Sequence, residues 1–151
     1  MTLEARLSYA TLAPNSFKAM LALSATVHGG ALGRKLVDLV FLRVSQINGC
    51  AFCIDMHWRD LIAQQEDPRH LNCVAGWREA PFFDARERAA LHWAEVVTGI
   101  PHRDPSDAEF AALRAHFSDA EIAELGFAIV VINAWNRLNV SFRTPVPAAP
   151  E

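Results

Sequence analysis

The sequence predicts an all-α protein that folds as a single domain. Three segments of its second half begin with one helix-start pattern, in which Asp84, Ser106 or Ser118 is followed three residues later by a Glu. Period-two alternation of apolar and polar residues, which marks half-buried strands, is absent, and the β-branched residues lie in stretches with helical periodicity. A length of 151 residues is sufficient for one well-buried core.

The first half of the chain contains three helical segments bounded by glycine, proline or Asn-Gly signals. They are expected over residues 16–27, 32–47 and 50–66. Residues 1–14 are expected to be irregular, and residues 15–143 to form the helical domain.

The second half adds a short helix at 69–77 and the three capped helices. The last long helix, 122–134, is apolar on every face, which predicts burial in the centre of the domain or between subunits. The tail, residues 144–151, is rich in proline and is expected to be extended and mobile, or draped on a neighbouring subunit.

Composition limits the partners of the protein. Hydrophobic residues make up 52% of the chain and the mean hydropathy is +0.11, which predicts an apolar subunit interface and therefore a homo-oligomer. A net charge of −3 offers no basic field for nucleic acid. No charge block marks a membrane patch, and no apolar run approaches the roughly 18 residues of a membrane span.

Cysteine usage and the N-terminal residues predict a cytoplasmic protein. Three cysteines, an odd number, fit a reducing compartment better than a secreted disulfide scaffold. Residues 1–6 lack the basic region and apolar core of a signal peptide.

The segment 36–60 holds the clearest chemical pattern, Cys50, Cys53 and His57. Residues three and four apart share a helix face, so these side chains line one side of a helix. An Asn-Gly pair just before Cys50 indicates a cap and puts Cys50 in the first turn, where unpaired N–H groups lower a cysteine pKa. Two thiols at this spacing lie about 5 Å apart at Cα, within the window for a disulfide. The pattern predicts a redox-active dithiol or a thiol nucleophile.

Asp38 interrupts the apolar run 36–41. A carboxylate in such a place has either a charged partner or a raised pKa, and a raised pKa makes it a proton acceptor near neutrality. The sequence leaves two interpretations open for Asp38: a proton acceptor, or an ion pair with Arg34 or Arg43.

The competing chemistry is a structural zinc site. Its ligands would be Cys50, Cys53, His70 and Cys73, whose spacing is compatible with zinc. Such sites hold poorly cored segments together, whereas this segment is strongly apolar, so zinc is the minor alternative. Cys73 is expected to be a buried small hydrophobe, and no metal or organic cofactor is predicted.

Residues 42–57, LRVSQINGCAFCIDMH, closely resemble the signature of the AhpD-like alkylhydroperoxidases, within the carboxymuconolactone decarboxylase superfamily. Further blocks agree with it at residues 75–81, 87–91 and 132–137, so that the resemblance covers about residues 15–145. It implies an AhpD-like helical bundle that assembles into a trimer or hexamer.

The resemblance also implies roles for four residues. Cys53 would attack the peroxide and become a sulfenic acid, with Cys50 as the resolving thiol and proton donor. His57 and Asp38 would form the proton relay that deprotonates Cys53.

Two departures from the family pattern stand out. The acid is usually Glu, and Asp38 is one methylene shorter, so the relay is expected to need a bridging water or to be slower. The best-studied branch carries a His between the cysteines, where this chain has Ala51-Phe52. The decarboxylase branch lacks the CxxC pair, which argues against lactone decarboxylation here.

The expected function is thiol-dependent reduction of a small-molecule hydroperoxide, with an external dithiol or thiol protein as reductant. The alternative is redox sensing or disulfide exchange without peroxidase turnover. Among the remaining polar residues, His28 is expected at the surface or as a cap. Asn139 is expected to bond to backbone or to a neighbouring subunit, with a substrate role as the minor alternative. Phe52 is expected to exclude water from the sulfurs.

Overall fold

The structure is a computed structural model in which residues 4–149 are described. Every regular element in this range is helical and none is a strand, which confirms the all-α prediction. The α-helices are α1 Tyr9–Leu12, α2 Pro14–His28, α3 Arg34–Asn48, α4 Ala51–Ala63, α5 Pro68–Asn72, α6 Ala85–Thr98, α7 Asp107–Arg114 and α8 Asp119–Phe142. Short 3-10 segments at Val74–Gly76 and Ile100–His102 lie in the connections, the first of them taking the place of the end of the helix predicted at 69–77.

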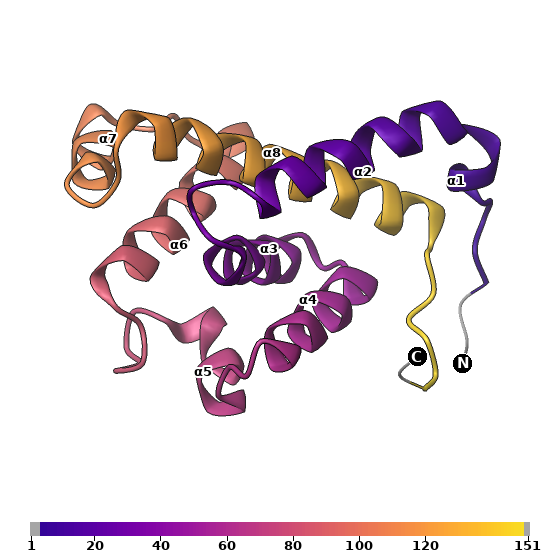
Figure 1. Cartoon of the computed structure of the whole chain (residues 1–151), viewed down its shortest axis with the longest axis horizontal. Helices are drawn as coiled ribbons and strands as arrows, with labels where there is room; N and C mark the ends of the chain where they lie inside the picture. The colour runs from indigo at the N-terminus through magenta and orange to yellow at the C-terminus, as the bar shows by residue number, and fades with distance from the viewer. Residues whose placement is uncertain (1–3, 150–151) are drawn as a thin grey trace.

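Helix α3 lies at the centre of the bundle (Figure 1). It packs against α4, α6 and α8, and every side chain from residue 36 to residue 42 is buried. One apolar core lies between α3, α6, α8 and the end of α2, and a second lies between α3, α4 and α5. Because α3 faces both cores, Asp38 on this helix is enclosed by protein on all sides.

Helices α6, α7 and α8 begin with the three predicted capping boxes. In each, the cap side chain accepts the backbone N–H of the Glu three residues later, and the Glu side chain accepts the backbone N–H of the cap. These bonds satisfy N–H groups that have no partner within the helix. The pairs are Asp84 with Glu87, Ser106 with Glu109 and Ser118 with Glu121.

The N-terminal segment departs from the expectation. Residues 1–14 are predicted to be irregular, but Tyr9–Leu12 forms α1 and α2 begins at Pro14. Proline is compatible with the first helical turn because its missing N–H would have no helical partner there. Arg6 donates from its backbone N–H and from Nη1 to carbonyl oxygens at the end of α8, at 2.9 Å each, which ties the segment to that helix. Residues 1–3 lie outside the described range.

Helix α8 continues to Phe142, beyond its predicted end at residue 134. The polar residues in this stretch do not interrupt the helix because their side chains bond to neighbouring elements. Asn133 donates to the Thr98 hydroxyl at 3.1 Å, and Asn136 donates to the Ser45 hydroxyl at 3.0 Å.

Burial of α8 is restricted to part of its surface. Its residues from Ile122 to Ile132 that face α3 belong to the first core, but Phe127 and Val130 are each 56% exposed. The predicted all-round burial within the domain is therefore wrong for this face, and burial between subunits stays a prediction.

The described part of the C-terminal tail is non-helical and leads away from the end of α8 (Figure 1). The Thr144 backbone N–H donates to the carbonyl of Asn139 at 2.9 Å. Figure 1 shows the tail and the N-terminal segment at the same end of the molecule. Residues 150 and 151, which complete the predicted tail, lie outside the described range.

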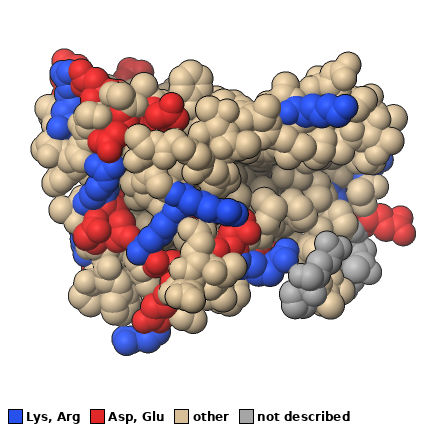
Figure 2. All heavy atoms as spheres, in the orientation of Figure 1, with Lys and Arg blue, Asp and Glu red and all other residues tan. Residues whose placement is uncertain are grey.

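The surface in Figure 2 carries charges of both signs, and Lys and Arg side chains are mixed with Asp and Glu toward α6 and α7. The same face is hollowed between α2 and α4, where uncharged atoms predominate. Within residues 4–149, none of the helices combines the length and the apolar character that crossing a membrane requires.

Candidate redox site

Helix α4 begins at the predicted dithiol. Helix α3 ends at Asn48. Its C-cap, Gly49, has a positive φ of 68°, a conformation that glycine adopts without strain, and the chain turns directly into α4. Cys50 is the N-cap of α4, one position before the first turn in which it was predicted, and its Sγ accepts the Cys53 backbone N–H at 3.3 Å. The helix ends at Ala63, three residues before its predicted end.

Cys50 and Cys53 form a disulfide with Cα atoms 5.3 Å apart, which agrees with the predicted spacing. The two residues are 1% and 0% exposed. The N-terminus of α4, with its partial positive charge, lies beside both sulfurs and favours a thiolate once the bond is reduced. The pair therefore provides two-electron thiol–disulfide chemistry in a site nearly closed to water.

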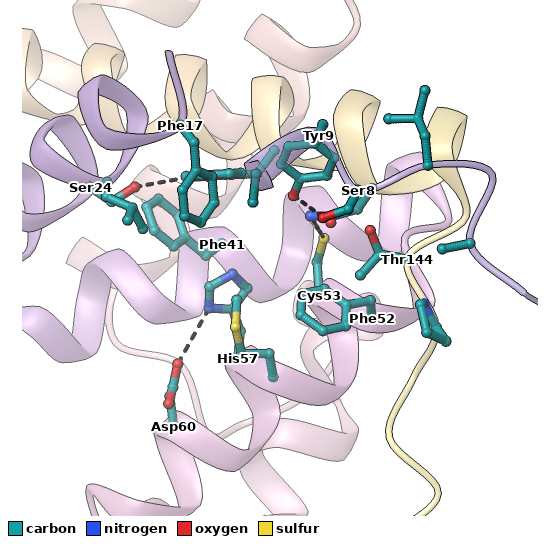
Figure 3. Close-up of a pocket in the computed structure, with 18 of the residues that line it drawn as sticks. Ser8, Tyr9, Phe17, Ser24, Phe41, Phe52, Cys53, His57, Asp60 and Thr144 are labelled. Carbon is teal, nitrogen blue, oxygen red and sulfur yellow. Dashed lines mark hydrogen bonds and ion pairs between the residues drawn. The ribbon is translucent and has the colours of Figure 1, made fainter. Parts of the chain in front are cut away.

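His57 lies one turn after Cys53 on the same face of α4 and is buried. Its Nδ1 lies 3.9 Å from Oδ1 of Asp38 and 3.7 Å from Oδ2 of Asp60, and has no hydrogen-bond partner among the described residues. Figure 3 shows His57 between Cys53 and Asp60. The His57 imidazole lowers the pKa of Asp60, and since 3.7 Å is too long for a hydrogen bond, we attribute this to an ion-pair contact.

Asp38 has several polar neighbours. Its Oδ1 accepts a hydrogen bond from Nε2 of His28 at 2.8 Å, and its Oδ2 accepts one from Nε2 of Gln64 at 2.6 Å. Nε of Arg34 lies 3.6 Å away, as an ion pair one turn back on α3. Arg43, the other predicted partner, pairs with an acidic residue of α6 instead. The carboxylate thus belongs to a polar group that includes His57 and extends beyond the predicted residues.

The sequence interpretation assigned neither Gln64 nor His28 to this group, and expected His28 at the surface or as a cap. Nδ1 of His28 lies 2.9 Å from the carbonyl oxygen of Ser24, and its Nε2 faces Asp38. A carbonyl and a carboxylate are both acceptors, so Nδ1 carries a hydrogen and a second proton lies between Nε2 and Oδ1. The hydrogen bond to Asp38 raises the pKa of His28. His28 and Asp38 are ten residues apart across a Gly-Gly turn, a separation with no helical periodicity to indicate the contact.

Asp38, His57 and Asp60 form the group of potential metal ligands found among the described residues, with ligand atoms within 4.8 Å of one another. Both Asp38 oxygens already accept hydrogen bonds, from His28 and Gln64. The cluster is therefore better suited to holding and moving a proton than to coordinating an ion.

The ligands of the alternative zinc site are not brought together in residues 4–149. The sulfurs of Cys50 and Cys53 are bonded to each other, and Nδ1 of His70 lies 3.0 Å from a carboxylate oxygen of Glu66. Cys73 is a free, partly buried cysteine that packs against the second core, close to its predicted role.

A second polar group reaches the disulfide from the opposite helix. The side-chain amide of Asn139, on α8, donates from Nδ2 to Sγ of Cys53 at 3.5 Å. The hydroxyl of Tyr9, on α1, donates to Oδ1 of the same amide at 2.9 Å. The sequence interpretation assigned neither residue to the site, because their contacts span 86 and 130 positions of the chain.

A cavity of about 550 Å³ opens beside Cys53. Cys53, His57 and Asn139 contribute to its wall, and most of the remaining wall is apolar, so that an organic molecule of moderate size fits with its reactive end at the sulfur. Tyr9 and Cys53 both point into it (Figure 3). Its apolar side chains come from the N-terminal segment, α2, α4 and α8, and include Leu7, Phe17, Leu21, Phe52, Met56 and Trp135.

The fold and the site together define an all-α protein with a CxxC disulfide in the wall of an apolar cavity. The model of the carboxymuconolactone decarboxylase family matches residues 14–96, more than half of the chain, and the chain belongs to this family.

Relatives from two bacteria support this assignment. The chain is 35% identical over 136 residues to YdfG of Bacillus subtilis (strain 168), which covers 90% of this chain and 92% of the relative. It is 33% identical over 108 residues to YnjA of Escherichia coli (strain K12), which covers 72% of this chain and 59% of the relative.

Solved structures confirm the AhpD-like fold. A protein of Agrobacterium tumefaciens, which bears the name of the antioxidant defence protein AhpD, is 41% identical with a TM-score of 0.93, over 97% of this chain and 100% of that chain. A peroxidase-related protein of Ralstonia eutropha JMP134 with an AhpD core is 23% identical with a TM-score of 0.81, over 92% and 74% of the two chains. The debrominase Bmp8 has the same fold at 18% identity and a TM-score of 0.82, over 91% and 74% of the two chains.

Proposed function

We propose that the protein is a thiol-dependent hydroperoxide reductase. The Cys53 thiolate attacks the terminal oxygen of a hydroperoxide, the O–O bond breaks, and the released alkoxide takes a proton to become an alcohol. Cys53 is then a sulfenic acid, which the Cys50 thiol converts to the disulfide with loss of water. An external dithiol or thiol protein supplies the two electrons that return both cysteines to the reduced form.

The observation that carries the proposal is the Cys50–Cys53 disulfide, held in the wall of an apolar cavity and next to a histidine. A peroxidatic cysteine must be a thiolate, must meet its substrate in a site with little water, and must have a resolving thiol within reach. The helix N-terminus, the cavity and Cys50 meet these three needs at one sulfur. Membership of the carboxymuconolactone decarboxylase family agrees with this chemistry, and so does the likeness to the Agrobacterium tumefaciens protein that bears the name of an antioxidant defence protein.

His57 and Asp38 are proposed as the proton relay for Cys53. The distance of 3.9 Å between His57 Nδ1 and Asp38 Oδ1 leaves a gap that the longer Glu of the family pattern would shorten. A bridging water, or a small movement in the reduced protein, would complete the contact. His28 shares a proton with Asp38 and lies in the cavity wall, so it is the partner of the relay on the cavity side.

The cavity favours an organic hydroperoxide over hydrogen peroxide. Its apolar side chains offer burial to a hydrocarbon or aromatic group, whereas hydrogen peroxide has no such group to bury. We further propose that the reductase acts in the cytoplasm as a homo-oligomer, a trimer or a hexamer.

Redox sensing or disulfide exchange without turnover is the competing function. A protein partner, whether an exchange substrate or a thiol-protein reductant, would have to reach the disulfide directly, yet the two cysteines are almost fully buried. Small molecules that enter the cavity are therefore the better match for this site.

The test is the rate of peroxide consumption by purified protein with excess dihydrolipoamide or dithiothreitol, using cumene hydroperoxide and hydrogen peroxide in parallel. Wild type should exceed the reductant background and prefer the organic peroxide. The Cys53→Ser variant should fall to background, and Cys50→Ser should lose turnover but form a sulfenic acid once. Cys73→Ser, which leaves the disulfide intact, is the matched control. Equal rates for wild type and Cys53→Ser would reject the peroxidase and leave a sensor or exchange protein.

A further inference from the structure

We propose that Asn139 is a further catalytic residue: its side-chain amide stabilises the thiolate form of Cys53, and Tyr9 is the positioning residue that fixes the direction of the amide. The inference rests on the proposed function, in which Cys53 is the thiol that ionises. Its test needs no peroxide, so the two can fail separately.

The contact between Asn139 and the sulfur is direct. Nδ2 lies 3.5 Å from Sγ of Cys53, and Asn139 is only 5% exposed, so water competes little for the N–H. An amide N–H can only donate, and a thiolate accepts a hydrogen bond more strongly than a thiol or a disulfide sulfur does. A donor that binds the charged form better lowers the pKa of the thiol.

Tyr9 decides which end of the amide meets the sulfur. The Tyr9 hydroxyl donates to Oδ1 of Asn139 at 2.9 Å, which turns Nδ2 toward Cys53. Burial raises the pKa of Tyr9, so its hydroxyl keeps its hydrogen at neutral pH. With the amide reversed, an oxygen would face the thiolate and the sulfur would lose its donor, while Nδ2 would meet the Tyr9 hydroxyl, which would then have to turn its own hydrogen away.

The other titratable groups in the cavity lie on different elements. They are Tyr9 on α1, His28 on α2, and His57 and Asp60 on α4, with the buried Asp38 of α3 behind His57. Helix α8 contributes the neutral Asn139. The amide therefore acts on the sulfur without adding a charge that would compete with the relay through His57 and Asp38.

Stabilisation of this thiolate serves both halves of the cycle. In the peroxide step the thiolate is the nucleophile that takes the terminal oxygen. In the reduction step a thiolate of the external dithiol attacks Sγ of Cys53, which lines the cavity; the S–S bond breaks, and Cys50 leaves with the electron pair and takes a proton. The second thiol of the reductant then displaces Cys53, which leaves as a thiolate. Asn139 donates to the Cys53 thiolate both when it attacks the peroxide and when it is released in the reduction step.

The experiment measures the pKa of Cys53 in the Cys50→Ser background, where no disulfide can form. Iodoacetamide alkylation of the peptide that contains Cys53 is followed by mass spectrometry from pH 5 to pH 10. Asn139→Leu removes the donor at similar volume and should raise the thiol pKa by about one unit, a loss of about tenfold in alkylation rate at pH values below the pKa. Tyr9→Phe leaves the amide free to turn and should also raise the thiol pKa, with a loss of about threefold in alkylation rate.

Asn136→Leu is the matched control, because Asn136 is a buried amide one turn earlier on α8 that bonds to Ser45 and Asn48 instead. The pKa of Cys53 in this variant should equal that in the Cys50→Ser protein without further change. An unchanged pKa in Asn139→Leu and Tyr9→Phe, or an equal rise in Asn136→Leu, would overturn the inference. If Asn139→Leu fails to fold, Tyr9→Phe decides. Absence of peroxide turnover in wild type would reject the proposed function while leaving a measured pKa effect in place.

Discussion

Two polar groups reach the Cys53 side of the disulfide from different directions. On one side His57 is followed by Asp38 and His28, a group that holds a proton. On the other side Asn139 offers a neutral N–H to the sulfur. Thiolate stabilisation and proton transfer are thus carried by different side chains, so that substitutions separate the two effects.

At the residue scale, the His28–Asp38 pair makes stability depend on pH. The pKa of His28 is raised in the folded protein, so its contribution is fully present below the unfolded pKa of about 6.5 and is lost as pH rises through the folded value. His28→Leu should lower the free energy of unfolding by about 1–2 kcal/mol at pH 6, and by less at pH 9. Urea denaturation across this range measures the difference.

The exposed His102 provides the control for this prediction. His102→Leu should shift stability equally at pH 6 and pH 9. A His28→Leu difference that stays constant with pH, or grows toward pH 9, would contradict the assigned proton between His28 and Asp38.

At the scale of elements, the side-chain caps of the helices are of two kinds. Helices α5, α6, α7 and α8 begin with oxygen caps that satisfy backbone N–H groups. Helix α4 begins with the sulfur of Cys50, a weaker acceptor, and its start is also the redox site. The oxygen caps thus stabilise the starts of their helices, whereas the start of α4 holds the redox-active sulfurs.

Removal of one oxygen cap should have a predictable cost. The Ser118 side chain accepts the backbone N–H of Glu121 at 3.2 Å at the start of α8. Ser118→Ala should lower the free energy of unfolding by about 1 kcal/mol, while Ser118→Asp retains an acceptor and should stay close to wild type. Urea denaturation of the three proteins compares them. Equal stability of Ser118→Ala and wild type would show that the cap contributes nothing to α8.

At the scale of the whole molecule, one face of α8 lies at the redox site and another face is exposed. One face carries Asn139 to the sulfur and packs on α3, while Phe127 and Val130 are exposed on the described chain. Large exposed apolar side chains on a long helix are typical of an interface.

Assembly through α8 follows as a prediction. If this face joins subunits, the double variant Phe127→Glu, Val130→Glu should reduce the molar mass in light scattering toward that of one chain, because buried charges without partners oppose association. Leu12→Glu on α1, a control at another exposed apolar residue, should keep the wild-type mass. A wild-type monomer would reject the predicted oligomer, and an unchanged mass in the double variant would place the interface elsewhere.

Local patterns in the sequence were sufficient for much of the fold and part of the site. The capping boxes, the shared face of Cys50, Cys53 and His57, and the break at Gly49 each involve residues within one or two helical turns. Backbone geometry sets their relations, so spacing along the chain predicts them. The prediction failed for Tyr9–Leu12 and for the end of α8, where packing against other elements outweighs a weak local signal.

The remaining contacts of the site cannot be predicted from spacing along the chain. Gln64 reaches Asp38 over 26 positions, Asn139 reaches Cys53 over 86 and Tyr9 reaches Asn139 over 130. Each pairs side chains whose meeting depends on how α1, α3, α4 and α8 pack, and packing is a property of the assembled core. The chain sequence thus accounts for which thiols can react, because a short helical segment holds them together. The groups that hold the proton and face the sulfur follow from the fold, because long-range burial alone brings them into contact.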